Sequence, residues 1–204
     1  PIYGVEVLAQ GFAQAAQQLG PEALQLVMLG NGSLAGNLRQ VFNRAGVSEQ
    51  VFFPGQVNQN DLPRFYNMAD LYVSASRTDG TSISLLEALA CGTPALLSDI
   101  PGNREWLEPG QQGWYFQDGD ADSLTQAILH AAAHRHCLPE MGRAARQLAE
   151  QRADWEKNFK MLFEAYKLAC PDESGYANRS TPMMSQVSGH AIGLPGKRED
   201  PHES

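Results

Sequence analysis

Two acidic residues, Asp79 and Glu87, lie in a stretch that combines hydroxyl groups, a glycine and an apolar helix. The hydroxyls and Gly80 precede the helix, and the unpaired backbone N–H groups at a helix start favour an anion. Glu87 is surrounded by leucine and alanine, where an ionised carboxylate is costly to bury unless a donor bonds to it. A helix that begins near Ser82 places Glu87 about 8 Å along its axis, at ~1.5 Å per residue. The spacing suits one elongated polar ligand, held at the helix mouth and again one or two turns further in.

The same stretch also has ordinary structural interpretations. Asp79 and Gly80 form a common turn pair, and some of the hydroxyls between residues 74 and 84 must cap the helix. Glu87 could reach solvent or pair with a buried arginine instead of a ligand. We interpret Cys91, just beyond the helix, as a small buried residue rather than a nucleophile.

Helical periodicity alternates with short apolar runs along most of the chain. We expect helices over residues 4–18, 34–45, 60–68, 82–90, 124–131, 138–148 and 154–166, with Asn60-Asp61 and Asp154 as caps. We expect strands at residues 24–29, 51–53, 70–74, 94–98 and 113–116, with Phe52, Trp114 and Trp155 in the core. Short apolar strands without strict alternation are typical of a parallel sheet that is buried on both faces. The fold class is therefore α/β, with a Rossmann-like parallel sheet flanked by helices.

Composition sets the domain organisation. The chain has 204 residues, which is enough for one domain with a real core. No strand precedes the first helix, so we expect residues 1–169 to be an N-terminally truncated domain. Residues 170–204 are rich in proline, glycine, serine and charge, and we expect a disordered tail there.

Charge and cysteine usage narrow the partners. The net charge of −8 argues weakly against nucleic acid or an anionic membrane as the main partner. No apolar run approaches the ~18 residues of a transmembrane helix. Three widely spaced cysteines point to a reduced, cytoplasmic setting. His130 and His134 have a spacing that permits a metal, but no third ligand fits, so we predict no metal site.

Two further loops follow predicted strands, and ligands of open parallel sheets bind at the carboxyl ends of the strands. Gly30-Asn31-Gly32-Ser33 follows the first predicted strand, and Gly55-Gln56-Val57 follows the second. Taken alone, the first pattern is as well explained by a turn as by a ligand site, and the second is better explained by a plain turn.

Taken together, these residues resemble the signature of the retaining nucleotide-sugar glycosyltransferases of family 4, the group 1 transferases with the GT-B fold. That signature is an acid, seven residues and a glutamate, followed by Ala-x-Ala-Cys-Gly-Thr-Pro; here it extends from Asp79 through Glu87 to Pro94. Further similar pieces are 29–32, 51–57, 69–74 and 99–107. The resemblance covers roughly residues 4–168 and corresponds to the C-terminal, donor-binding half of such an enzyme.

The resemblance implies a role for each matching position. Glu87 would hold the ribose hydroxyls of the nucleotide, and Asp79 would be the catalytic residue that contacts the sugar hydroxyls near the reacting carbon. Backbone amides of the loop before the helix would meet the diphosphate or sugar, at Gly80, Thr81, Ser82 and Ile83. Gly55 and Val57 would lie against the base, and Gly30 and Gly32 would let the backbone approach the donor. The donor would be a nucleotide diphosphate sugar, with no other cofactor.

The sequence departs from the family pattern in three ways. The first acid is Asp79 instead of glutamate, and Tyr3 stands where a lysine that neutralises the diphosphate is usual. The family's arginine would precede residue 1, and Arg77 is the nearest basic residue that could compensate. The N-terminal domain, which supplies the acceptor site, has no counterpart here and would also provide any peripheral membrane contact. We therefore expect the fragment to bind donor weakly and to transfer nothing.

Two rival functions remain open on sequence grounds. One is a nucleotide-sugar epimerase or a phosphorylase of the same fold, and the other is a non-catalytic nucleotide-binding or docking module. The base, the sugar and the acceptor are not specified by the sequence.

Overall fold

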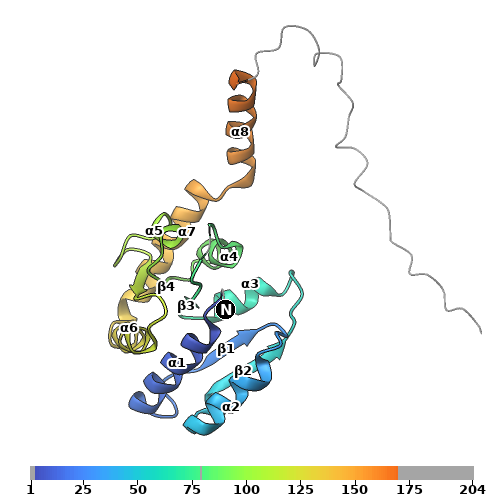
Figure 1. Ribbon diagram of the computed structural model, residues 1–204. Coiled ribbons are helices and arrows are strands. Elements are labelled where there is room, and N and C mark those ends of the chain that lie inside the picture. Colours follow the sequence, from blue (N-terminus) through green and yellow to red (C-terminus); the bar gives the residue numbers. More distant parts are fainter. Residues whose placement is uncertain (1–2, 79, 170–204) are drawn as a thin grey trace, which may run out of the picture. The chain divides into compact units, whose positions relative to one another are not determined.

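The computed structural model describes residues 3–78 and 80–169. The chain divides into two units, residues 1–158 and 159–204, and each is described by itself. In chain order the elements are α1 (Val5–Leu19), β1 (Leu26–Leu29), α2 (Ala35–Ala45), η1 (Ser48–Gln50), β2 (Val51–Gly55), α3 (Leu62–Met68), β3 (Tyr72–Ser74), α4 (Ile83–Ala90), β4 (Ala95–Ser98), α5 (Pro101–Arg104), β5 (Gly113–Phe116), α6 (Ala121–Ala133), η2 (Arg135–Cys137), α7 (Leu138–Arg152) and α8 (Trp155–Ala169). Strands alternate with helices as the periodicity predicts (Figure 1).

The strands form two separate parallel sheets. One pairs β1 with β2, and the other has the order β3-β4-β5. Leu26 lies opposite Val51 in the first sheet, and Tyr72 lies opposite Ala95 in the second. The prediction of an α/β fold with parallel strands is thus confirmed, but the single sheet that we expected is interrupted between β1 and β3.

Strand β4 divides the core into two apolar layers because successive side chains of a strand point to opposite faces. Leu96 packs into a cluster with Phe42 of α2 and Leu124 of α6. Ala95 and Leu97 pack into a second cluster with residues of α4 and α7. All four residues of β4 are buried, as expected for a strand that is covered on both faces.

The two sheets share one apolar layer, although no strand pairing among the described residues joins them. The cluster that contains Leu96 also includes side chains of α1 and α2 and packs against partly buried residues of β1 and β2. Helices α1 and α6 lie side by side, and a Cβ on Gly11 of α1 would lie 2.8 Å from side-chain atoms of Leu124. The close approach of these helices therefore depends on the absence of a side chain at Gly11.

Two of the three aromatic residues that we expected in the core lie at the surface. Phe52 is 70% exposed and Trp155 is 75% exposed, whereas Trp114 is half-buried and packs against the first apolar layer. Phe52 is exposed because β2 is covered on one face only, so its side chains alternate between covered and exposed positions. Trp155 begins α8, whose described residues are all exposed.

Of the predicted helix caps, those at Ser82 and Asp154 form and the one at Asp61 does not. Ser82 precedes α4, and its hydroxyl accepts a hydrogen bond from the Leu85 N–H at 3.4 Å. Asp154 accepts one from the Lys157 N–H at 3.2 Å, so both residues cap their helices. Asp61 stands before α3, but its side chain makes no cap bond; one carboxylate oxygen lies 3.4 Å from an Arg64 guanidinium nitrogen. The backbone of Asp61 is itself in the helical region (φ −95°, ψ −18°), whereas a capping residue usually has an extended backbone.

Two sequence predictions concern residues outside the described ranges, namely the disordered tail over 170–204 and the local structure at Asp79. Among residues 3–78 and 80–169, no helix combines the length and hydrophobicity that crossing a bilayer requires.

Candidate functional site

Hydroxyl groups gather at the start of α4. The Oγ atoms of Ser82 and Ser84 lie 3.0 Å apart, and the Tyr72 hydroxyl oxygen lies 2.8 Å from Ser84 Oγ. The Ser82 hydroxyl is used by the cap, as the sequence predicted for some of this group. Thr81 and Ile83 are exposed, and the N–H groups of the first helical turn point away from the helix body. The start of α4 can therefore accept an anionic ligand.

Glu87 is half-buried on α4, and one residue of α3 bonds to it. The Tyr66 hydroxyl donates a hydrogen bond to Glu87 Oε2 at 3.0 Å. In the described part of the chain Glu87 forms no ion pair. The donor that the sequence required for this carboxylate is thus a tyrosine rather than a buried arginine.

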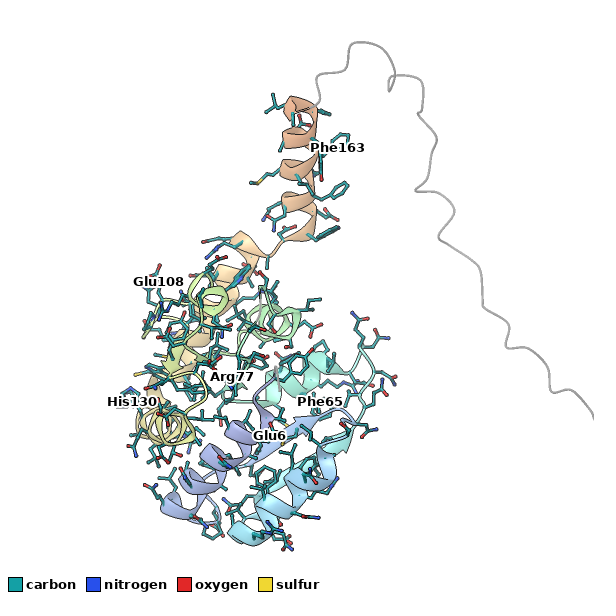
Figure 2. The ribbon with its side chains drawn as sticks, in the orientation of Figure 1. Glu6, Phe65, Arg77, Glu108, His130 and Phe163 are labelled. Atoms are coloured by element: carbon teal, nitrogen blue, oxygen red, sulfur yellow. The ribbon has the colours of Figure 1, made fainter. Side chains whose placement is uncertain are left out.

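Burial raises the pKa of Tyr66 well above its ordinary value, and the hydrogen bond to Glu87 and the charge of Glu87 raise it further. The Tyr66 hydroxyl therefore remains protonated at neutral pH and acts as the donor. Phe65, the residue that precedes Tyr66 on α3, is labelled in Figure 2.

The two glycine loops meet at the carboxyl ends of β1 and β2. The Gly30 N–H donates to the Gly55 carbonyl oxygen at 2.8 Å. Gly55 has a φ of +83°, and a Cβ there would lie 3.3 Å from Asn31 Oδ1. A side chain at Gly55 would therefore disturb both the backbone and its neighbour. Gly32 is exposed, with nothing within 4 Å of a Cβ placed on it, so its loop is open to a ligand.

The basic residue that we considered as a compensating cation is already engaged. Arg77, in the loop after β3, is labelled in Figure 2, and its Nε lies 3.6 Å from Asp118 Oδ1. Gly4 is buried, and a Cβ on it would overlap the carbonyl oxygen of Ala75. Tyr3, which occupies the family's lysine position, is 70% exposed.

Three residues of the site were not identified from the sequence. Tyr66 and Tyr72 fall within a predicted helix and a predicted strand, and Thr93 falls within the family signature, but none of the three was given a role. The Thr93 hydroxyl donates to the Tyr66 carbonyl oxygen at 2.8 Å. A usable signal did exist, because a partly buried tyrosine hydroxyl needs a polar partner and the acid at position 87 needs a donor.

Cys91 follows α4 and is half-buried. Burial raises the pKa of its thiol, Arg146 opposes that shift, and Glu87 adds to it. The thiol is thus mainly protonated at neutral pH, which agrees with its interpretation as a structural residue.

Two pockets lie away from the predicted site. One, of about 300 Å³, is formed by α2, η1 and β2 around Phe42 and Phe53. The other, of about 420 Å³, is lined by Asp99, Tyr115 and residues that follow β5. Neither includes Glu87 or the loop before α4. Among the described residues, no group of three or more His, Cys, Asp or Glu side chains could hold a metal ion.

The fold is shared with GT-B glycosyltransferases of known structure. HepE from Anabaena, solved in complex with UDP, superposes with a TM-score of 0.73 at 22% identity, over 82% of this chain and 46% of that protein. A glycosyltransferase from Rickettsia africae gives a TM-score of 0.73 at 17% identity, over 85% of this chain and 46% of that one. The α/β domain therefore has the same fold as the corresponding parts of these proteins.

The family follows from the sequence match. Residues 2–148 match the family described as "Glycosyl transferases group 1", and the chain belongs to that family. Among curated relatives, a GDP-mannose-dependent alpha-(1-6)-phosphatidylinositol monomannoside mannosyltransferase of Mycolicibacterium smegmatis is 28% identical over 171 residues, which is 80% of this chain and 44% of the relative. Mannosylfructose-phosphate synthase of Agrobacterium fabrum is 24% identical over 158 residues, 75% of this chain and 35% of the relative. The chain thus spans less than half the length of these relatives.

Proposed function

We propose that this chain is the donor-binding half of a glycosyltransferase that moves a sugar from a nucleotide diphosphate sugar to an acceptor with retention of configuration. Glu87 binds the ribose hydroxyls, and Asp79 contacts the sugar near its reacting carbon. The start of α4, from Gly80 to Ile83, receives the diphosphate. Gly55 and Val57 contact the base, and Gly30 and Gly32 let the backbone approach the donor.

In the proposed reaction the bond between the sugar's anomeric carbon and the diphosphate oxygen breaks, and a bond to an acceptor hydroxyl oxygen forms. The hydroxyl proton passes from the acceptor to the departing diphosphate oxygen, and the nucleoside diphosphate leaves with it. Donors aimed at the developing negative charge lower the barrier of such a step, and the N–H groups at the start of α4 are groups of that kind.

One observation carries the proposal: a half-buried carboxylate on α4, without an ion pair to any described residue, is held by a neutral hydroxyl donor. A carboxylate with spare acceptor capacity suits the two donor hydroxyls of a ribose. The cap and the hydroxyls at the start of the same helix add the anion site that a diphosphate requires. The match to the group 1 family supports the same assignment.

The direct test is a calorimetric titration of the chain with UDP, GDP and ADP. We expect one of them to bind and Glu87→Gln to weaken its binding about tenfold, because a bidentate charged acceptor is lost. Glu49→Gln, at an exposed position in η1, removes the same charge and should leave the affinity unchanged. Glu87→Ala should weaken binding more than Asp79→Ala does. No binding of any nucleotide by the folded chain would contradict the proposal and leave a docking module as the better interpretation.

We further infer that the chain acts as part of a longer protein, in which an N-terminal domain supplies the acceptor site. The interruption between β1 and β3 supports this inference, because each of these strands has one edge without a described partner. The share of the relatives' length that the chain spans supports it as well. The isolated chain should therefore transfer no sugar even where it binds the nucleotide.

A further inference from the structure

We propose that Tyr66 is a positioning residue of the donor site, which orients the Glu87 carboxylate for the ribose of a nucleoside diphosphate. This inference rests on the proposed function, because it assigns a role to the residue that holds the proposed ribose ligand. It is carried by the contacts that fix Tyr66 and by the bond that it makes to Glu87.

Tyr66 is held at its backbone and at its ring. Its carbonyl oxygen accepts the hydroxyl of Thr93 at 2.8 Å, and Thr93 is 2% exposed. Its ring meets the ring of Tyr72 edge to face, with the centroids 6.2 Å apart. Because both contacts act on parts of Tyr66 other than its hydroxyl, they set where that hydroxyl points.

The hydroxyl of Tyr66 meets one carboxylate oxygen of Glu87. It donates to Oε2 at 3.0 Å, and the described residues donate no side-chain hydrogen bond to Oε1. A glutamate side chain on a helix has several rotamers, and a fixed donor favours the one in which the carboxylate faces it. Each carboxylate oxygen has two acceptor positions, so the bond to Tyr66 leaves capacity for both hydroxyls of a ribose.

Tyr72 of β3, whose ring meets that of Tyr66, links this arrangement to the start of α4. The Tyr72 hydroxyl lies 2.8 Å from Ser84 Oγ, and Ser84 lies 3.0 Å from the Ser82 cap through its Oγ. Thr93 lies in the segment that follows α4, so its bond to Tyr66 ties α3 to the C-terminal end of α4. The expected geometry of Glu87 therefore depends on α3, an element in which the sequence showed no polar function.

Tyr66→Phe isolates this role because it removes only the hydroxyl and keeps the ring against Tyr72. The first probe is the nucleotide, among UDP, GDP and ADP, that binds the unaltered chain most tightly. The second probe is the 2′,3′-dideoxy form of the same nucleotide. We expect the unaltered chain to prefer the ribose form. Tyr66→Phe should reduce that preference about fivefold, which corresponds to the net value of about one hydrogen bond. Affinity for the dideoxy form should stay within about twofold, because the lost bond acts only through the ribose ligand.

Tyr115→Phe is the matched control. Its hydroxyl donates to the carbonyl oxygens of Leu107 and Asn103 at 2.8 and 3.0 Å, so the change again removes a partly buried tyrosine hydroxyl. We expect this variant to keep the full ribose preference. A second measurement needs no variant at all: the near-ultraviolet tyrosine difference spectrum of the unaltered chain should be larger with the ribonucleotide than with the dideoxy form.

The outcomes separate the two proposals. If the chain binds no nucleotide, or if Glu87→Gln leaves the ribose preference intact, the proposed function fails. If Glu87→Gln abolishes the preference but Tyr66→Phe leaves it unchanged, the positioning role is overturned. It is also overturned if Tyr66→Phe weakens both nucleotides equally, which is the signature of a merely structural tyrosine. Should Tyr66→Phe not fold, equal tyrosine difference spectra with the two nucleotides would overturn the role.

Discussion

Gly142 of α7 lies directly against Gly92, the residue that follows α4 and Cys91. A Cβ on Gly142 would overlap the carbonyl oxygen of Gly92, and Gly92 itself has a φ of +76°. The two glycines thus allow α4 and α7 to approach each other across the second apolar layer. The glycine of the Cys91-Gly92-Thr93-Pro94 segment therefore has a packing role as well as a turn role.

Gly142→Ala should destabilise the fold. The added methyl group meets rigid backbone rather than a movable side chain, so one of the two elements must shift. We expect the free energy of unfolding to fall by about 1–3 kcal/mol, the range of overpacked cores. Urea unfolding followed by circular dichroism measures the change.

Gly36→Ala provides the opposite control. Gly36 is an exposed helical residue of α2, and a Cβ there meets nothing within 4 Å. We expect this variant to be about 0.5–1 kcal/mol more stable, because alanine favours the helix over glycine. Equal effects at the two positions would contradict the proposed contact between α7 and the end of α4.

Thr93→Val should lower the stability by about 1 kcal/mol. The valine has nearly the same shape, but it cannot donate to the Tyr66 carbonyl oxygen as the buried threonine hydroxyl does. The loss stays moderate because that oxygen also accepts the Ala69 N–H at 3.1 Å. The same urea titration measures the free energy of unfolding of this variant. Thr78→Val, at an exposed position, is the control, and its free energy of unfolding should change little. A Thr93→Val variant as stable as the control would remove the link between α3 and the segment after α4.

The element order was predictable because it depends on local patterns. The apolar run at residues 94–98 identified β4, and the hydroxyl of Ser82 identified the start of α4. The cap at Asp154 was predictable for the same reason. In contrast, Asp61 has the right residue type for a cap, but its backbone is helical and its side chain makes no cap bond. A cap also needs an extended backbone at the capping residue, which the residue type alone does not specify.

The missed features depend on contacts between elements. Phe52 has the composition of a core residue, yet its exposure follows from the uncovered face of β2. Tyr66 and Glu87 are separated by 21 positions and meet only because α3 packs beside α4. The sequence indicated that a strand before the first helix is lacking, but the apolar sequences of the strands do not show where in the sheet the gap falls. Periodicity specifies which side of an element is apolar, but not which element covers it.

Cys91 should react slowly with iodoacetamide in the folded chain. Because burial raises its thiol pKa, less thiolate is present at pH 8 than in an unfolded chain. We expect alkylation of the Cys91 peptide to be at least about threefold slower in buffer than in urea, as measured by mass spectrometry. The folded state holds the thiol proton more tightly, so this group's contribution to stability is present below the ordinary thiol pKa and is lost as the pH rises above it. A faster reaction in the folded chain would identify Cys91 as an activated thiol.

Within residues 3–78 and 80–169, β1 and β3 each have one edge that pairs with no strand, and these edges lead to the last prediction. Gly4 lies against Ala75, just after β3, so a strand that led into α1 would end beside the carboxyl end of β3. Such a strand would run parallel to β3 and fill the gap between the sheets. In this chain we therefore expect the backbone amides of β1 and β3 that do not bond to β2 or β4 to exchange rapidly with deuterium.

In a longer protein that includes the residues before Pro1, those amides should become protected by at least about tenfold, because a new ladder takes them out of water. Hydrogen exchange resolved by mass spectrometry measures the segments 26–29 and 72–74 in both proteins. Strand β4 is the internal control, since it is paired on both sides and should be protected equally in the two. If β1 and β3 are already as protected as β4 in this chain, or gain nothing in the longer one, the gap does not accept a strand. In that case the inference of a longer working protein loses its structural support.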